Sequence, residues 1–288
     1  METPPIVYAL MRSPAEAVDF CSRLGSRWQR PGCAFGPELS AANEPFLVHE
    51  IVHNVLRANG LEGVPALQEG TAEVYGGTLW NEPSTERSLP LASLTDVDAF
   101  QAGASMNYSA AASLVSFLLD VGGEARLVAL MARTTYDTDL AGLDAAALEV
   151  YGRSMTDLHA EWSARPAEPG SRLARPVFQC SAAPFELGTT QSVFLERGVS
   201  ESISRGGSLR TFTVPRDGML RVLVAAPLPA ITVLSCERGP LVVSEQLTGR
   251  DAEVTAAIPA GRYAIWVTAE LLEGDLTELE VSLFVDVE

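Results

Sequence analysis

The chain has 288 residues, of which 47% are hydrophobic and 20% are charged, and its formal net charge is −17. This composition is typical of a globular protein long enough for two domains, and it excludes an intrinsically disordered chain. All 20 basic residues are arginines and 37 residues are acidic, so the chain should repel phosphate backbones, and we expect no nucleic-acid partner.

The first elements in chain order are a predicted strand and a predicted helix. The apolar run at 6–10 predicts the strand. Ser13, Pro14 and Glu16 then occupy the N-cap, first and third positions that begin many helices, and this helix should end near Leu24. The first part of the chain therefore opens with one short strand before its helices.

Helices dominate the chain from there to about residue 165. Apolar residues at helical spacing predict helices at 44–59, 65–75, 107–121, 124–133, 143–151 and 155–162. The helix at 107–121 should end at Gly122 and Gly123. Ser154 and Asp157 predict an N-terminal cap for the helix at 155–162. No apolar run reaches the ~20 residues that a membrane-spanning helix needs, so we expect no membrane span.

The composition changes near residue 165, where a linker rich in proline and glycine begins. Alternating and β-branched segments predict strands at 209–214, 219–225, 231–235, 253–258, 263–268 and 276–287. Many short strands separated by regular turns are typical of a β-sandwich. The predicted fold class is α+β, with a mainly helical domain at 1–165, a linker at 166–175 and an all-β sandwich at 176–288.

Four cysteines occur as two separated pairs, Cys21 with Cys33 and Cys180 with Cys236. An even number, paired within the predicted domains, favours two disulfides and an oxidising compartment over the alternative of four buried thiols. Neither pair has the C-x-x-C spacing of a thiolate zinc site or a redox motif. The first five residues are not a signal peptide, so we expect the mature form of a secreted, periplasmic or cell-surface protein.

The motif His49-Glu50-Ile51-Val52-His53 lies on a predicted helix. Residues four apart on a helix share one face, so both imidazoles can reach one metal ion. Glu50 is offset from that face and can accept a proton from a water that the metal activates. The motif therefore predicts a zinc site with Glu50 as general base, against the alternative of two surface histidines.

A zinc site of this kind needs a third protein ligand, and the next predicted helix carries Glu69 and Glu73. The segment Leu67-Gln68-Glu69-Gly70-Thr71-Ala72-Glu73 resembles the second helix of the gluzincin metallopeptidases. The resemblance implies that Glu69 is the third zinc ligand and that Glu73 orients a zinc-bound histidine. Two alternatives stay open: Glu73 is the ligand in place of Glu69, or both acids lie on a solvated helix face.

The resemblance continues at Ser105-Met106-Asn107-Tyr108-Ser109-Ala110, which precedes a long apolar helix as in gluzincin aminopeptidases. It implies that the Tyr108 hydroxyl stabilises the oxyanion of the tetrahedral intermediate. The alternative is an aromatic residue that packs on the core at the start of a helix. Tyr75 is a weaker candidate for the same role, and we expect His159 to be a surface or capping residue rather than a fourth ligand.

The resemblance covers about residues 6–163 and departs from the family in three respects. Fifteen residues, 54–68, separate His53 from Glu69, fewer than in the aminopeptidases and thermolysin; the domain is smaller; and the Gly-x-Met-x-Asn segment is absent. The resemblance therefore does not imply aminopeptidase specificity. In the second half, 215–218 and 258–267 resemble the small sandwich domains found C-terminal to secreted bacterial peptidases.

These observations predict a zinc metallopeptidase that hydrolyses peptide or protein substrates. One alternative is a binding or adhesion protein that keeps a zinc-binding gluzincin fold without catalysis. Another is a zinc hydrolase with a substrate other than a peptide. The segment 80–101 has no readable pattern, and the sequence leaves substrate, endo- or exopeptidase action and oligomeric state open.

Overall fold

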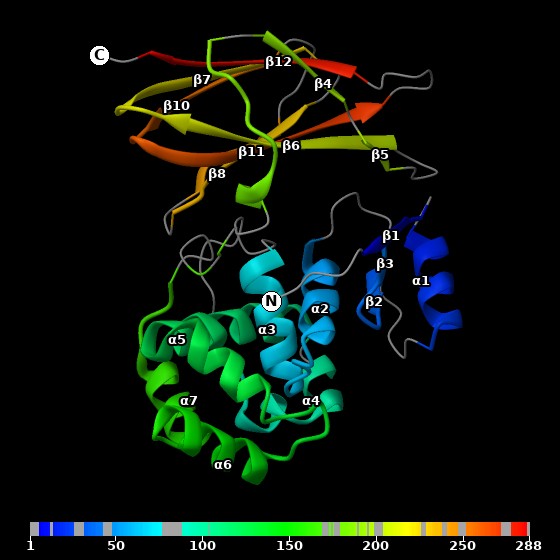
Figure 1. The fold of residues 1–288 in the computed structure, drawn as a ribbon, viewed down its shortest axis with the longest axis vertical. Coiled ribbons are helices and arrows are strands. Elements are labelled where there is room, and N and C mark those ends of the chain that lie inside the picture. The colour runs from blue at the N-terminus through cyan, green and yellow to red at the C-terminus, as the bar shows by residue number, and fades with distance from the viewer. Residues whose placement is uncertain are drawn as a thin grey trace. The chain divides into compact units, whose positions relative to one another are not determined.

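A computed structural model describes residues 6–11, 14–25, 32–42, 48–76, 88–102, 104–168, 173, 175, 179–188, 190–194, 196–198, 204–225, 229–237, 241–246, 252–271 and 278–286. The chain divides into two compact units, one of residues 1–7, 34–39 and 48–174 and one of residues 8–33, 40–47 and 175–288. Helices α2 to α7 form most of the first unit, and antiparallel strands form a sandwich in the second (Figure 1). The α+β class predicted from the sequence is confirmed.

The described helices follow the predicted ones closely. Their bounds are α1 Pro14–Arg23, α2 Val48–Ala58, α3 Pro65–Gly76, α4 Val97–Ala102, α5 Ala104–Met131, α6 Leu140–Tyr151 and α7 Met155–Ala164. The two helices predicted at 107–121 and 124–133 are the two arms of α5, which breaks where Gly123 has a φ of 72°. The Ser154 hydroxyl accepts from the Asp157 amide, which confirms the predicted cap of α7. Helix α4 begins within 80–101, where the sequence shows no readable pattern.

Helix α3 packs closely against both of its neighbours because two of its residues are glycines. A Cβ atom on Gly70 would lie 2.4 Å from the Ala111 carbonyl oxygen of α5. A Cβ atom on Gly76 would lie 2.8 Å from the His49 Cα atom of α2. The glycine that follows Glu69 therefore sets the depth at which this part of α3 lies against α5.

Replacing Gly70 with alanine should lower the free energy of unfolding by about 1–3 kcal/mol, because the new methyl group meets backbone that cannot move aside cheaply. Urea denaturation followed by circular dichroism measures the change. The control is Gly142→Ala in the first turn of α6, where the added atom meets only the side chains of Thr138 and Asp139, at 3.0 and 3.2 Å. Equal losses of stability in the two variants would contradict this account.

A three-stranded sheet, in the order β1-β3-β2, precedes α2 in the chain. Its strands are β1 Val7–Leu10, β2 Gly32–Phe35 and β3 Leu39–Ala42. The buried Asn54 amide of α2 donates to the carbonyls of Gly36 and Leu39, at 2.9 and 3.0 Å. The sequence predicted β1 but neither β2 nor β3, and the turn between these two strands anchors the helix that carries the histidines.

The sandwich has a four-stranded sheet in the order β10-β7-β12-β4 and a five-stranded sheet in the order β5-β6-β11-β8-β9. The strands are β4 Thr190–Phe194, β5 Glu196–Gly198, β6 Ser204–Val214, β7 Gly218–Ala225, β8 Ala230–Ser235, β9 Leu241–Gln246, β10 Ala252–Ile258, β11 Gly261–Leu271 and β12 Glu278–Asp286. Leu220, Val222 and Val224 of β7 alternate into the core between the sheets. Of the described strands of the sandwich, the sequence missed β4, β5 and β9, and all three lie at sheet edges.

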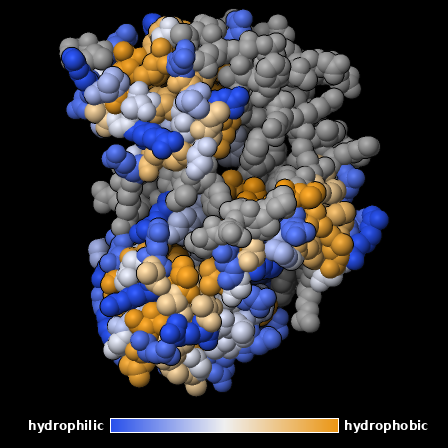
Figure 2. Space-filling model, viewed as in Figure 1, coloured by the Kyte–Doolittle hydropathy of each residue, from blue (hydrophilic) through white to orange (hydrophobic). Residues whose placement is uncertain are grey.

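The described surface carries few large hydrophobic side chains that are exposed, namely Val7, Leu24, Leu148 and Met219. Figure 2 shows hydrophobic and hydrophilic residues intermingled over the described part of one face. Scattered apolar residues of this kind are normal on globular proteins and do not by themselves mark an interface. Among the helices that the structure describes, none is long and apolar enough to cross a membrane.

Both predicted disulfides form, Cys21 with Cys33 and Cys180 with Cys236. The second joins the short 3-10 helix Gln179–Ser181 to the residue after β8. The Arg262 guanidinium also donates to the Cys180 carbonyl, and the Cys236 amide donates to the Arg262 carbonyl. This disulfide therefore holds the segment that enters the sandwich against the five-stranded sheet.

Replacing Cys180 and Cys236 together with alanine should destabilise the protein by about 4 kcal/mol, against about 3 kcal/mol for Cys21 and Cys33, because a longer closed loop restricts the unfolded chain more. The sequence separations are 56 and 12 residues. Urea unfolding of both double variants measures the difference. A larger loss for the shorter loop would contradict the loop-entropy account.

Candidate metal centre

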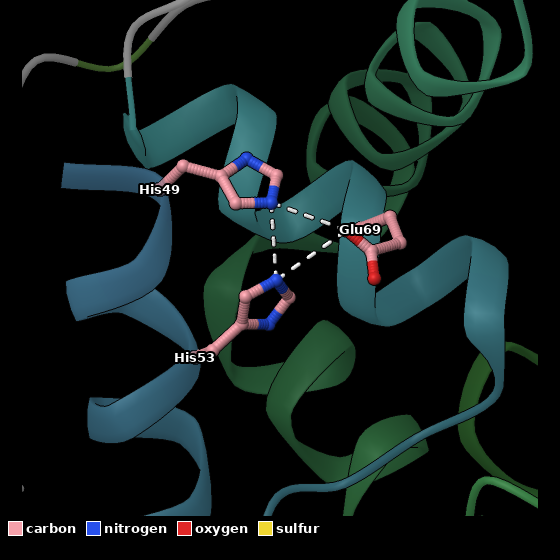
Figure 3. A group of neighbouring side chains, drawn as sticks. All are labelled: His49, His53 and Glu69. Carbon is pink, nitrogen blue, oxygen red and sulfur yellow. Dashed lines mark hydrogen bonds and ion pairs between the residues drawn. The ribbon is translucent and has the colours of Figure 1, made fainter. Parts of the chain in front are cut away.

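Two helices bring His49, His53 and Glu69 together (Figure 3). His49 and His53 lie one turn apart on α2, and their rings point toward Glu69 on α3. The two Nε2 atoms are 3.1 Å apart, and the Glu69 Oε2 atom lies 3.1 Å from the first and 3.4 Å from the second. All three side chains are largely buried, with 15% or less of each exposed.

The separations among these three atoms fit a zinc ion. Ligand atoms about 2.0–2.1 Å from a tetrahedral zinc lie about 3.3 Å from one another, close to the 3.1–3.4 Å found here. Two imidazoles and one carboxylate are also the ligands of many catalytic zinc sites, which leave a fourth position open. The donor set and its spacing therefore agree with zinc.

The outer nitrogen of each ring has its own acceptor. The His49 Nδ1 atom lies 3.0 Å from the Glu73 Oε1 atom, and the His53 Nδ1 atom lies 3.3 Å from the Gln68 Oε1 atom. The Gln68 amide nitrogen donates to the Leu61 carbonyl, so its oxygen faces His53. Since a carboxylate and an amide oxygen can only accept, each Nδ1 atom carries a hydrogen, and in the neutral form of each ring the Nε2 atom has a lone pair that faces the other two ligand atoms.

This arrangement is suited to a positive charge at its centre. With both rings neutral, the two Nε2 atoms and the Glu69 Oε2 atom are all acceptors that face one another, and a proton on His49 or a bound metal ion would each relieve that arrangement. Burial alone lowers the pKa of His49, but hydrogen bonds to Glu69 and Glu73 outweigh it and raise that pKa well above its ordinary value. Burial alone raises the pKa of Glu69, but His53 and His49 hold it well below its usual range. The same carboxylates would stabilise a divalent metal ion.

Gln68, which the sequence reasoning passed over, should matter for metal affinity. Replacing it with leucine removes the acceptor that fixes the His53 ring and should weaken zinc binding by about 10–100-fold. Competition with a chromophoric zinc chelator measures the affinity. Thr71→Val is the control on the same helix, because the Thr71 hydroxyl is buried against the Met131 sulfur rather than against a ligand. An unchanged affinity for Gln68→Leu, or an equal loss for Thr71→Val, would contradict this role.

Glu50 and Tyr108, the other predicted site residues, lie on elements that border the cluster. Glu50 follows His49 on α2 and is half-buried. The Tyr108 ring, near the start of α5, lies 6.0 Å from the His49 ring between centroids. The phenol is therefore a neighbour of the histidine cluster, while its part in chemistry stays a prediction.

A second tyrosine, Tyr136, lies within electrostatic reach of the cluster from the loop between α5 and α6. Burial and then the negative charge of Glu69 raise the pKa of Tyr136, whereas Arg57 lowers it. The sequence reasoning missed Tyr136, because nothing local marks a loop residue 67 positions after the predicted ligand Glu69. Only the packing of the loop reveals that it lies near the site.

Two other predicted residues have structural partners. The Tyr75 hydroxyl donates to Glu124 of α5 at 3.2 Å. The His159 Nε2 atom lies 2.8 Å from the Leu89 carbonyl, and its ring lies 5.3 Å from that of the buried Trp162. His159 is not part of the three-residue metal cluster found among the described residues.

No protein-family model matches the chain, and no curated protein matches it. Among solved structures, a pre-peptidase C-terminal domain of collagenase from Bacillus anthracis has 19% identity and a TM-score of 0.29, covering 36% of this chain and 94% of that one. An adhesin domain of Lys-gingipain from Porphyromonas gingivalis has 14% identity and a TM-score of 0.18, covering 28% and 61%. A carbohydrate-binding module of lichenase 5A from Cellvibrio mixtus has 10% identity and a TM-score of 0.20, covering 34% and 98%. Similarity at these TM-scores is too low to say anything about function.

Proposed function

We propose that the chain is a zinc-dependent metallopeptidase whose metal is held by His49, His53 and Glu69. One observation carries the proposal: two Nε2 atoms and a carboxylate oxygen converge within 3.1–3.4 Å, with the outer nitrogen of each ring held by Glu73 or Gln68. Three largely buried side chains whose ligand atoms face one another favour a metal site over a pair of surface histidines. The spacing of the motif and the fit to tetrahedral zinc support the same choice.

The chemistry assigns a separate role to each neighbouring side chain. A bound zinc ion would lower the pKa of the attacking water and polarise the scissile carbonyl. Glu50 takes the proton of that water and later delivers it to the leaving amine, because it follows His49 on α2 and is not one of the three candidate ligands. Tyr108 donates its phenolic hydrogen to the oxyanion of the tetrahedral intermediate, from its place beside His49.

We also propose that the protein works in an oxidising compartment, outside the cytoplasm. The two disulfides support this location, since such bonds persist mainly in secreted, periplasmic and surface proteins. Peptide or protein substrates are then the expected targets. The sandwich would act as an accessory domain for stability, attachment or substrate docking.

A protease assay on a degenerate peptide library tests the proposal. The purified full chain should cleave a subset of the peptides, lose that activity with a chelator and regain it when about one equivalent of zinc is restored. Mass spectrometry of the products also separates endopeptidase from exopeptidase cleavage. Cleavage that a chelator leaves unchanged, or none by the zinc-loaded protein, would contradict the proposal.

A further inference from the structure

One face of α3 contacts three different parts of His49. The Glu69 Oε2 atom lies 3.1 Å from the His49 Nε2 atom, and the Glu73 Oε1 atom lies 3.0 Å from the His49 Nδ1 atom. Gly76, the last residue of the same helix, lies against the His49 backbone. Positions 69, 73 and 76 are spaced four and then three residues apart, so they share one face of α3. A single helix therefore contacts both ring nitrogens and the backbone of His49.

The contact at Gly76 leaves no space for a side chain. A Cβ atom there would lie 2.8 Å from the His49 Cα atom, 2.9 Å from its backbone nitrogen and 3.2 Å from its Cβ atom. The φ of Gly76 is not positive, so a left-handed helix end does not require glycine at this position. Alanine would also be the better helix former. The glycine is therefore explained by the approach of α2 and not by the conformation of α3.

Helix α2 is held in place further along its length. The buried Asn54 side chain donates to two carbonyl groups at the turn between β2 and β3. One turn after His49, the His53 ring contacts α3 through both of its nitrogens. A group added at Gly76 would therefore displace mainly the first turn of α2, which carries His49.

We propose that Gly76 is a positioning residue for His49 in the zinc site. Its lack of a side chain lets the start of α2 approach α3 until the His49 ring fits between the carboxylates of Glu69 and Glu73. Zinc sites keep their ligand distances within about 0.2 Å of the ideal values, whereas an added methyl group would have to move the His49 backbone by several tenths of an ångström. This inference rests on the zinc site of the proposed function, and it adds to that site a residue that is not a ligand.

The test compares the zinc affinity of Gly76→Ala with that of the wild type, both as full chains, by competition with a chromophoric chelator. The affinity should fall about tenfold, as when the support of a metal ligand is lost. Cobalt(II) bound in place of zinc should show a changed visible absorption spectrum, because that spectrum reports the coordination geometry. The control is Gly122→Ala on α5, where the added atom would lie 2.4 Å from the Cε1 atom of Tyr151. This variant should lose stability but keep its zinc affinity and its cobalt spectrum.

Thermal unfolding of the metal-free proteins shows whether the two substitutions cost comparable stability. An unchanged zinc affinity and cobalt spectrum in Gly76→Ala would overturn the inference while leaving the zinc site intact. An equal loss of affinity in Gly122→Ala would also overturn it, as would a Gly76→Ala chain that does not fold even with saturating cobalt, because the effect would then belong to the fold. A wild-type protein that binds no zinc would overturn the proposed function and this inference together.

Discussion

Replacing Glu50 with glutamine is expected to lower kcat for peptide cleavage by about 10²–10⁴-fold, the range typical of a lost general base. Glutamine keeps the volume of the side chain but cannot take a proton from water. Zinc should stay at about one ion per chain, because Glu50 is not among His49, His53 and Glu69. Initial rates with the library-derived peptide, alongside metal analysis of the same samples, measure both quantities.

Glu62→Gln is the matched control, because Glu62 is an exposed carboxylate in the loop between α2 and α3. It should leave both the rate and the zinc content unchanged. If Glu50→Gln retains the biological activity of the protein, the alternative of a binding protein with a zinc-holding fold is the better account. If both variants lose activity equally, surface charge rather than a general base controls the rate.

Replacing His53 with alanine is expected to abolish stoichiometric zinc binding, reducing the metal content from about one ion per chain to a small fraction. Only two ligand side chains would remain, and the inward space left by the ring would not hold the ion. In the wild-type protein, free zinc at about 1,000 times its Kd should stabilise the fold by about 4 kcal/mol. That stabilisation should disappear in the variant, as measured by thermal unfolding with and without zinc.

His159→Ala is the control for a histidine that does not bind metal, since its Nε2 atom lies against the Leu89 carbonyl. It should keep its zinc and its zinc-dependent stabilisation. Far-ultraviolet circular dichroism of metal-free His53→Ala and metal-free wild type checks that the variant folds. A folded His53→Ala protein that retains one zinc, or a His159→Ala protein that loses it, would show that the metal lies elsewhere.

The sequence by itself determined the features that depend on local chemistry. Two histidines four residues apart share a helix face in any helix, so the spacing placed both rings on one side of α2 before the fold was known. The Ser154 cap, the break at Gly123 and the alternation of β7 are local for the same reason. The cysteine pairs followed from their number and spacing and match the observed disulfides.

Only the tertiary structure decided which side chains other than Glu69 and Glu73 lie near the histidines. Gln68 of α3 contacts His53, and the charge of Glu69 acts on Tyr136 in the loop after α5. Both interactions depend on how α3 and this loop pack near α2, which no local sequence pattern predicts. Strands β2 and β3 have four residues each, too few to show alternation, yet the turn between them holds Asn54. The sequence also could not predict the close approach of α3 to its neighbours at Gly70 and Gly76. The need for glycine at these positions is visible only from the backbone of α5 and α2 that a Cβ atom would meet.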